Sequence, residues 1–269
     1  MLSNEELTAR IVSAAQARDS ELELAVWVAQ LIMPADDPAE FFDEIHAATG
    51  ALAERVDRSQ GDIGQQVLAT LTQAGFGQQD QSEQAVTAQH SHIGWVLAHR
   101  RGIPISLAVI LIAVARQCGL SAWGVNYPGH FLVHVQDRLV DPLTLRFLDE
   151  AQLLQRDTTS ADLRRQLLPA TPQGFVLRML NNLKALQMNQ QLWTGVLDLI
   201  DVQSAVSAAD DDLIATLEYE RGQCWVQLGA YAVASQAFAR CAEKTTAPEL
   251  ARQALEKVEQ LGQRREVLH

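Results

Sequence analysis

The stretch RRGIPISLAVILIAVARQCG, residues 100–119, decides the core of the fold. Between residues 105 and 117 the apolar side chains fall on every side of a helix, which is typical of a helix enclosed by other elements. Pro104 suits the start of that helix, because an amide in the first turn has no partner within the helix. Cys118 and Gly119 end the pattern, so the sequence predicts one buried central helix.

Strands follow this helix directly. β-branched and aromatic residues alternate over 122–127, 131–136 and 138–140. The short connection between the last two segments favours antiparallel pairing. The sequence therefore predicts a small antiparallel sheet next to the central helix.

The rest of the chain carries helical patterns. Apolar residues recur at helical spacing over 22–32, 38–56 and 63–74, and Ser3 with Glu6 forms a capping box for a first helix. Helices return after the sheet and continue toward the C-terminus. The fold class predicted is α+β and mostly helical.

Small and aromatic residues recur in a helix-turn-helix pattern between residues 222 and 241. Small residues let two helices approach, and aromatic rings fill the space between them. The segment resembles one tetratricopeptide repeat, with cysteine at a position usually held by alanine. The residues of this pattern are Gly222, Trp225, Leu228, Gly229, Tyr231, Ala234, Phe238 and Cys241.

Composition excludes several classes of partner. The chain has 269 residues, with 33 Asp and Glu against 21 Lys and Arg, for a net charge of −12. No basic field is present to neutralise phosphates, so we expect neither nucleic acid nor an anionic membrane as partner. The longest uncharged apolar stretch, 103–115, is far shorter than the roughly 20 residues needed to cross a bilayer.

The cysteines and histidines favour a cytoplasmic protein without cofactor. Acidic residues stand where a signal peptide would carry bases, and three widely spaced cysteines suit reduced thiols better than a disulfide framework. The pairs His90 with His92 and His130 with His134 lack the spacing of zinc sites. We therefore expect a cytoplasmic protein that binds no metal and no cofactor.

The order of Gly102, Pro104, His130 and Asp141 resembles the transglutaminase-like superfamily. In that superfamily a thiol at a helix N-terminus, in a Gly-X-Cys turn, is followed by a His and then an Asp on neighbouring strands. Gly102 places Pro104 at the position of the thiol. The wider pattern, with helices before this core and a repeat after it, is similar to the bacterial SirB-type family.

The resemblance implies a transglutaminase-like, papain-like core with a small antiparallel sheet, followed by a tetratricopeptide-like helical region. The predicted division is an N-terminal helical part of the core over 1–90, the transglutaminase-like core over 91–170, and the helical region over 171–269.

Three residues are candidates for catalysis. His130 and Asp141 match the second and third members of the superfamily's site, whereas Pro104 has neither thiol nor hydroxyl. Ser106 is the alternative nucleophile, but it projects about 200° around the helix axis from position 104. Cys118 lies at the C-terminus of the central helix, where the helix dipole raises a thiol's pKa, so it is interpreted as a packing residue.

The hairpin decides which histidine meets the aspartate. A two-residue turn at Asp137 and Arg138 places Asp141 directly opposite His134. Contact between His130 and Asp141 then requires a wider loop or a bulge.

Six residues are candidates for binding. Arg100 and Arg101 are placed to hold a carboxylate beside the helix N-terminus, which favours anions. The alternative is that these arginines pair with surface acids. The binding set comprises Pro104, Arg100, Arg101, Tyr127, Trp225 and Tyr231.

Three functions remain open on these patterns. The first, which we favour, is a non-catalytic protein that binds a peptide or protein partner through a degenerate cleft and the helical repeat. The second is a hydrolase or acyl transferase that uses Ser106, or the His130 and Asp141 pair as general base. The third is a scaffold that acts through the repeat region alone.

Overall fold

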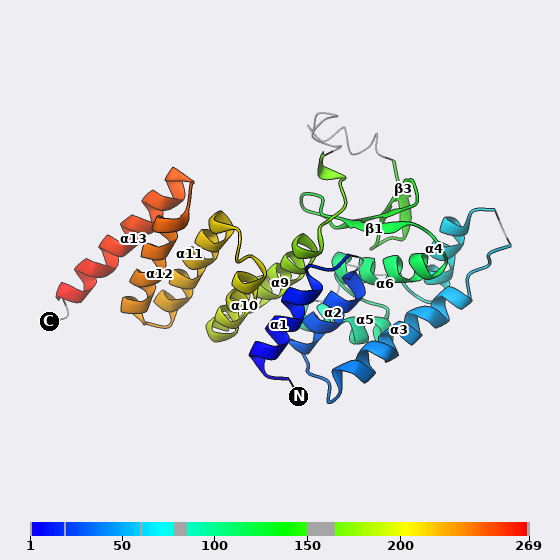
Figure 1. The fold of residues 1–269 in the computed structure, drawn as a ribbon, viewed down its shortest axis with the longest axis horizontal. Helices are drawn as coiled ribbons and strands as arrows, with labels where there is room; N and C mark the ends of the chain where they lie inside the picture. Colours follow the sequence, from blue (N-terminus) through cyan, green and yellow to red (C-terminus); the bar gives the residue numbers. More distant parts are fainter. Residues whose placement is uncertain (1, 19, 60, 78–84, 150–164, 268–269) are drawn as a thin grey trace. The chain divides into compact units, whose positions relative to one another are not determined.

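Helix α6, Pro104–Gln117, is the central element of the fold. Every residue from Ile105 to Ala115 is buried, which confirms the predicted enclosed helix. Ile103 is its N-cap in an extended conformation, and Gly119, with φ 81°, lies just beyond its C-cap Cys118. Figure 1 shows α6 between the sheet and the N-terminal helices.

The computed structural model describes residues 2–18, 20–59, 61–77, 85–149 and 165–267. The chain divides into two compact units, Met1–Met179 and Leu180–His269. The sequence predicted that the C-terminal helical region begins at residue 171. Helix α9, Pro172–Asn189, begins one residue later, and the boundary between the two units falls inside this helix.

Helices precede α6 in the first unit and pack around it. Side-chain caps explain several of their starts: Ser3 and Glu6 form the predicted capping box, and Asp37 accepts hydrogen bonds from the amides of Ala39 and Glu40. Helices α2, α3, α4 and α5 contact α6. These elements are α1 (Asn4–Ala14), α2 (Glu21–Gln30), α3 (Pro38–Glu54), α4 (Ile63–Gln73), the 3₁₀ turn η1 (Ala88–Ser91) and α5 (Ile93–His99).

Four antiparallel strands form one sheet in the order β1-β2-β3-β4. The three predicted strands are present, and a fourth short strand follows them. Strands β1 and β2 pack on α6, where a Cβ at Gly124 would lie 2.6 Å from the Phe131 ring. The strands are β1 (Ala122–Val125), β2 (Leu132–Val135), β3 (Arg138–Asp141) and β4 (Arg146–Leu148).

The turn between β2 and β3 lies one residue earlier than the sequence suggested. Val135 pairs with Arg138, so the two-residue turn is Gln136-Asp137, and Gln136 adopts a left-handed conformation with φ 58°. His134 consequently lies opposite Leu139, whereas a two-residue turn at Asp137 and Arg138 would place it opposite Asp141.

An ion pair fastens this hairpin to α4. Asp62 caps α4 by accepting from the amide of Gln65 at 2.9 Å, and the same carboxylate accepts from the Arg138 guanidinium at 2.6 Å. The Arg138 guanidinium lies 3.5 Å from the centroid of the Phe147 ring on β4. One arginine therefore contacts both a helix cap and a neighbouring strand.

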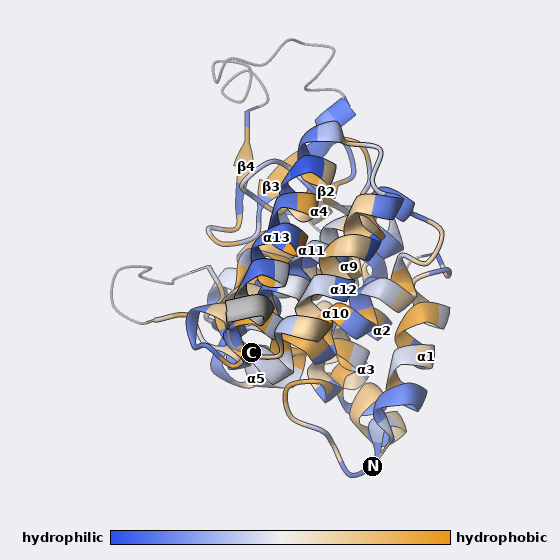
Figure 2. Ribbon diagram, turned by 90° about the vertical axis from the view of Figure 1, so that its left-hand side faces the viewer, coloured by the Kyte–Doolittle hydropathy of each residue, from blue (hydrophilic) through white to orange (hydrophobic). Residues whose placement is uncertain are grey.

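The second unit is helical in its described part. Helix α11 packs against α10 and α12, and α12 packs against α13, which is largely hydrophilic (Figure 2). A Cβ at Gly222 would lie 2.7 Å from the Phe238 ring, so the close approach of α11 and α12 expected from the sequence is present. The elements are α10 (Trp193–Val206), α11 (Asp211–Gln227), α12 (Tyr231–Lys244) and α13 (Pro248–Val267).

Among the described residues, no single helix has the length and hydropathy to cross a bilayer. Helices α5 and α6 meet these two criteria only when they are taken together, and the chain bends by 80° between them.

Candidate functional site

The head of α6 is held by a hydrogen-bond cluster around one carbonyl. The main-chain oxygen of His90, in η1, accepts from the amide of Ile103 at 3.1 Å and from the Ser106 hydroxyl at 2.6 Å. The Ser106 Oγ also lies 2.9 Å from the Ile103 carbonyl oxygen, so its one proton is shared or exchanged between two acceptors. This cluster joins η1 to the first turn of α6.

Gly102 is required by the same cluster. A Cβ at this position would lie 2.7 Å from the Ser106 Oγ and 3.0 Å from a methyl of Val96. The glycine of the predicted Gly-X-Cys-like turn thus has a packing role that does not depend on a nucleophile.

Pro104 and Ser106 have different environments. Pro104 is the first residue of α6 and is half-buried. The Ser106 side chain has no exposed surface, and its hydroxyl serves main-chain acceptors. A nucleophilic role for Ser106 would require the hydroxyl to leave both acceptors and reach solvent, so this geometry does not favour it.

His130 and Asp141 are not brought together. His130 is exposed, after a turn in which its amide donates to the Tyr127 carbonyl oxygen at 3.0 Å. Asp141 ends β3, and its carboxylate accepts from the amide of Leu143 at 2.9 Å and from the Thr144 hydroxyl at 3.1 Å. No hydrogen bond or ion pair joins His130 to Asp141 among the described residues.

The turn before His130 explains the position of that side chain. Pro128 and Gly129, with φ 75° at the glycine, occupy the second and third positions as in a type II turn. Tyr127 is only 5% exposed and packs with Val125, Leu132 and Leu139. The ring of Tyr127, one of the predicted binding residues, therefore belongs to a buried cluster on the sheet.

His134 lies beside a tryptophan that the sequence did not single out. Trp123 pairs with His134 across β1 and β2, and the two rings stack with centroids 5.1 Å apart. In the sequence Trp123 is visible only as an aromatic residue of a predicted strand. The register of β1 and β2 is needed to show that it lies opposite His134.

The remaining histidines near α6 cap a helix or pack against an aromatic ring. His92 caps α5 by accepting from the amide of Trp95 at 3.1 Å, and burial lowers the pKa of His92 below its usual value. The Trp95 ring lies between His90 and His99, with centroid distances of 4.8 Å and 4.2 Å. Within the described ranges, no group of three or more ligand side chains is placed to hold a metal ion.

Arg100, at the turn between α5 and α6, is influenced by the positive charge of Arg55. Arg100 ends α5 in a left-handed conformation with φ 60°, and its guanidinium lies 5.1 Å from the centroid of the Phe76 ring. Burial lowers the pKa of Arg100, and the positive charge of Arg55, which follows α3, lowers it further. No carboxylate of the described residues pairs with Arg55 or Arg100. Sequence analysis found Arg100 but missed Arg55, because 45 residues separate them.

The other predicted binding residues have separate settings. Arg101 is exposed. Trp225 and Tyr231 lie in the second unit, where both are half-buried: Trp225 packs against two clusters of α10 to α13, and Tyr231 packs beside one of them. Their contacts are those of helix packing.

Comparisons with known proteins show the family of this chain. A family model described as Transglutaminase-like superfamily matches residues 39–181, which run from α3 into α9. A UPF0162 protein of Pseudomonas aeruginosa is 30% identical over 224 residues, covering 78% of this chain and 81% of that protein. UPF0162 proteins of two Xylella fastidiosa strains are each 36% identical over 118 residues, 39% of this chain and 42% of theirs. No solved structure matches significantly.

Proposed function

Because this chain belongs to the transglutaminase-like superfamily, we propose that it is a member without a nucleophile, and that it binds a peptide or protein partner without cleaving or linking it. The observation that carries the proposal is the head of α6. Pro104 occupies the position where the superfamily resemblance places the thiol, and the nearby hydroxyl of Ser106 is sealed in hydrogen bonds to main-chain oxygens.

The partner that best fits this site carries carboxylates. The Arg100 guanidinium lies 5.1 Å from the centroid of the Phe76 ring, and burial together with the positive charge of Arg55 lowers the pKa of Arg100. A carboxylate beside Arg100 would offset these positive charges and form charge-assisted hydrogen bonds. An acidic peptide segment is therefore the proposed ligand, with the exposed Arg101 beside it.

Three cysteines support a cytoplasmic location for this activity. Cys118, Cys224 and Cys241 are all buried and unpaired with one another, as thiols are in a reducing compartment. The protein proposed here is thus a cytoplasmic one of SirB type.

Binding is tested with a fluorescent oligoglutamate peptide and an oligoglutamine peptide of equal length as the uncharged match. We expect the acidic peptide to bind at physiological salt, and Arg100→Gln to weaken it about tenfold, since a charge-assisted bond is lost. Arg55→Gln should act alike. Arg252→Gln, on an exposed helix of the second unit, is the control and should leave affinity unchanged. Equal affinity of the wild-type chain for both peptides contradicts the proposal.

Catalysis is tested with fluorophosphonate and thiol-directed activity probes on the full chain. We expect no probe to react at Ser106, His130 or a cysteine of the folded protein. Labelling that disappears in Ser106→Ala, while the variant remains folded by circular dichroism, would establish an enzyme and overturn the proposal.

A further inference from the structure

The second unit contains a cavity of about 420 Å³ that the proposed function does not use. It lies where the ends of α9 and α11 and the start of α10 meet α12 and α13. Trp193, Phe238 and Leu261 form apolar parts of its wall. Its volume falls within the roughly 300–1,000 Å³ that is typical of sites for small ligands.

Polar side chains line one part of the same cavity. Gln223 and Gln227 on α11 and Gln260 on α13 contribute amides, and Lys257 on α13 contributes an ammonium group. Lys257 is half-buried. The wall therefore combines a large apolar surface with one positive charge and several neutral donors.

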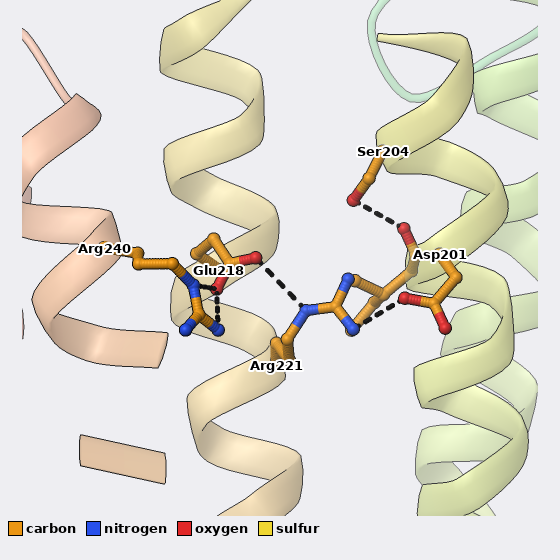
Figure 3. Close-up of polar contacts among 6 residues, drawn as sticks. Asp201, Ser204, Glu218, Arg221 and Arg240 are labelled. Carbon is orange, nitrogen blue, oxygen red and sulfur yellow. Dashed lines mark hydrogen bonds and ion pairs between the residues drawn. The ribbon is translucent and has the colours of Figure 1, made fainter. Parts of the chain in front are cut away.

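The charge of Lys257 is an exception in its surroundings. Figure 3 shows two other cations of this unit: Arg221 lies between Asp201 and Glu218, and Glu218 also accepts from Arg240. Side chains are described between residues 180 and 263. Within this range every other Lys and Arg has an acidic partner, whereas Lys257 forms no hydrogen bond or ion pair with a described residue. The pairs are Lys184–Glu220, Arg221–Asp201, Arg240–Glu218, Lys244–Asp211 and Arg252–Glu249.

We infer that this cavity binds a monocarboxylate with an apolar body. The ammonium group of Lys257 pairs with the carboxylate, and the glutamine amides complete its hydrogen bonds. The apolar body lies against Trp193, Phe238 and Leu261, where it leaves water. One cation among the residues that line the cavity fits a single negative charge better than the two of a phosphate monoester.

Cys224 does not add covalent chemistry to this site. Its side chain has no exposed surface, although its atoms line the cavity, and burial raises the pKa of its thiol to about 11. The thiol is therefore neutral at physiological pH and contributes an apolar surface. Binding in the cavity is reversible.

The carboxylate has two sources, a free acid or the C-terminus of a peptide. Titration calorimetry on the full chain compares octanoate with octanamide, and a short N-acetylated peptide ending in leucine with its C-terminal amide. Each acid and its amide match in apolar body and differ in charge. We expect at least one acid to bind about tenfold more tightly than its amide, and which acid does so identifies the source.

Variants assign the preference to Lys257. Lys257→Gln should remove the advantage of the acid and leave amide affinity unchanged, and Lys257→Arg should retain it. Lys244→Gln, which removes a cation paired with Asp211, is the control and should not alter the preference. Because Lys257 pairs with no acidic side chain of the described residues, Lys257→Gln should unfold at the wild-type temperature. Absence of acid binding, equal affinity for acid and amide, or a preference that survives Lys257→Gln would each overturn the inference.

Discussion

The Ser106 hydroxyl donates to the main-chain oxygen of His90 at 2.6 Å, across 16 residues of sequence. The same oxygen accepts from the amide of Ile103, so one carbonyl holds η1 against the head of α6. This bond explains why a serine stands in a helix whose other residues from Ile105 to Ala115 are all apolar. It also gives the serine a role in stability that can be measured.

Removing this hydroxyl should destabilise the first unit. We expect Ser106→Ala to lower the free energy of unfolding by about 1–3 kcal/mol, because the hydrogen bond to the buried His90 carbonyl is lost. Urea denaturation followed by circular dichroism measures the change. Thr8→Ala removes an exposed hydroxyl bonded within its own helix and should cost much less. An equal loss in the free energy of unfolding for the two variants would show that the bond to His90 stabilises the fold no more than an exposed hydrogen bond does.

Gly102→Ala should be destabilising through the same group. The new Cβ would lie 2.7 Å from the Ser106 Oγ and 3.0 Å from Val96, so we expect a loss of about 1–3 kcal/mol in denaturation. Gly61→Ala, where nothing lies within 4 Å of the added Cβ, is the control.

Combining Gly102→Ala with Ser106→Ala tests whether the clash is with the hydroxyl. Without the Oγ, the nearest contact of the added Cβ is a methyl of Val96. We expect the double variant to be more stable than the sum of the single losses predicts, by about 0.5 kcal/mol or more. Simple additivity would place the conflict at Val96 alone.

Gly222 and Gly262 should respond in opposite directions to alanine. A Cβ at Gly222 would lie 2.7 Å from Phe238, so Gly222→Ala should separate α11 from α12 and cost about 1–3 kcal/mol. Gly262 lies in α13 with nothing within 4 Å of an added Cβ, and Gly262→Ala should stabilise by up to about 1 kcal/mol through helix propensity. Thermal unfolding measures both, and a neutral Gly222→Ala would contradict the close packing.

His92 should make stability depend on pH. Burial lowers the pKa of His92 in the folded chain, so the unfolded chain takes up the proton more readily. The contribution is fully present above the ordinary histidine pKa of about 6.5 and is lost as pH falls below it. His92→Asn retains a capping side chain and removes the titration, so its stability should fall less between pH 7 and 5.5. Denaturation at both pH values, with His130→Asn as an exposed control, tests this; equal slopes for wild type and His92→Asn would refute it.

Local patterns predicted the elements that depend on local causes. The enclosed helix α6 followed from its uninterrupted apolar sequence, and the first helix from the capping box of Ser3 and Glu6. The close approach at Gly222 was visible because small and aromatic residues recur at helical spacing. The family followed from the order of Gly102, His130 and Asp141 along the chain.

The hairpin shows why the site was harder to predict. Moving a two-residue turn by one position changes every cross-strand partner but leaves each side chain on the same face, so alternation cannot distinguish the two registers. The left-handed backbone of Gln136 selects the observed one, and glutamine gives little warning of it. The approach of Arg55 to Arg100 depends on how α3 packs, which no local pattern encodes.

The carboxylate of Asp62 has two roles: it caps the N-terminus of α4, and it pairs with Arg138 of the hairpin. These contacts hold the pKa of Asp62 below its usual value, with the amide of Gln65 as the largest cause. Neutralising this single group in acid loosens a helix start and a strand together. One protonation therefore removes contacts from both α4 and β3, although 76 residues separate the aspartate from its arginine.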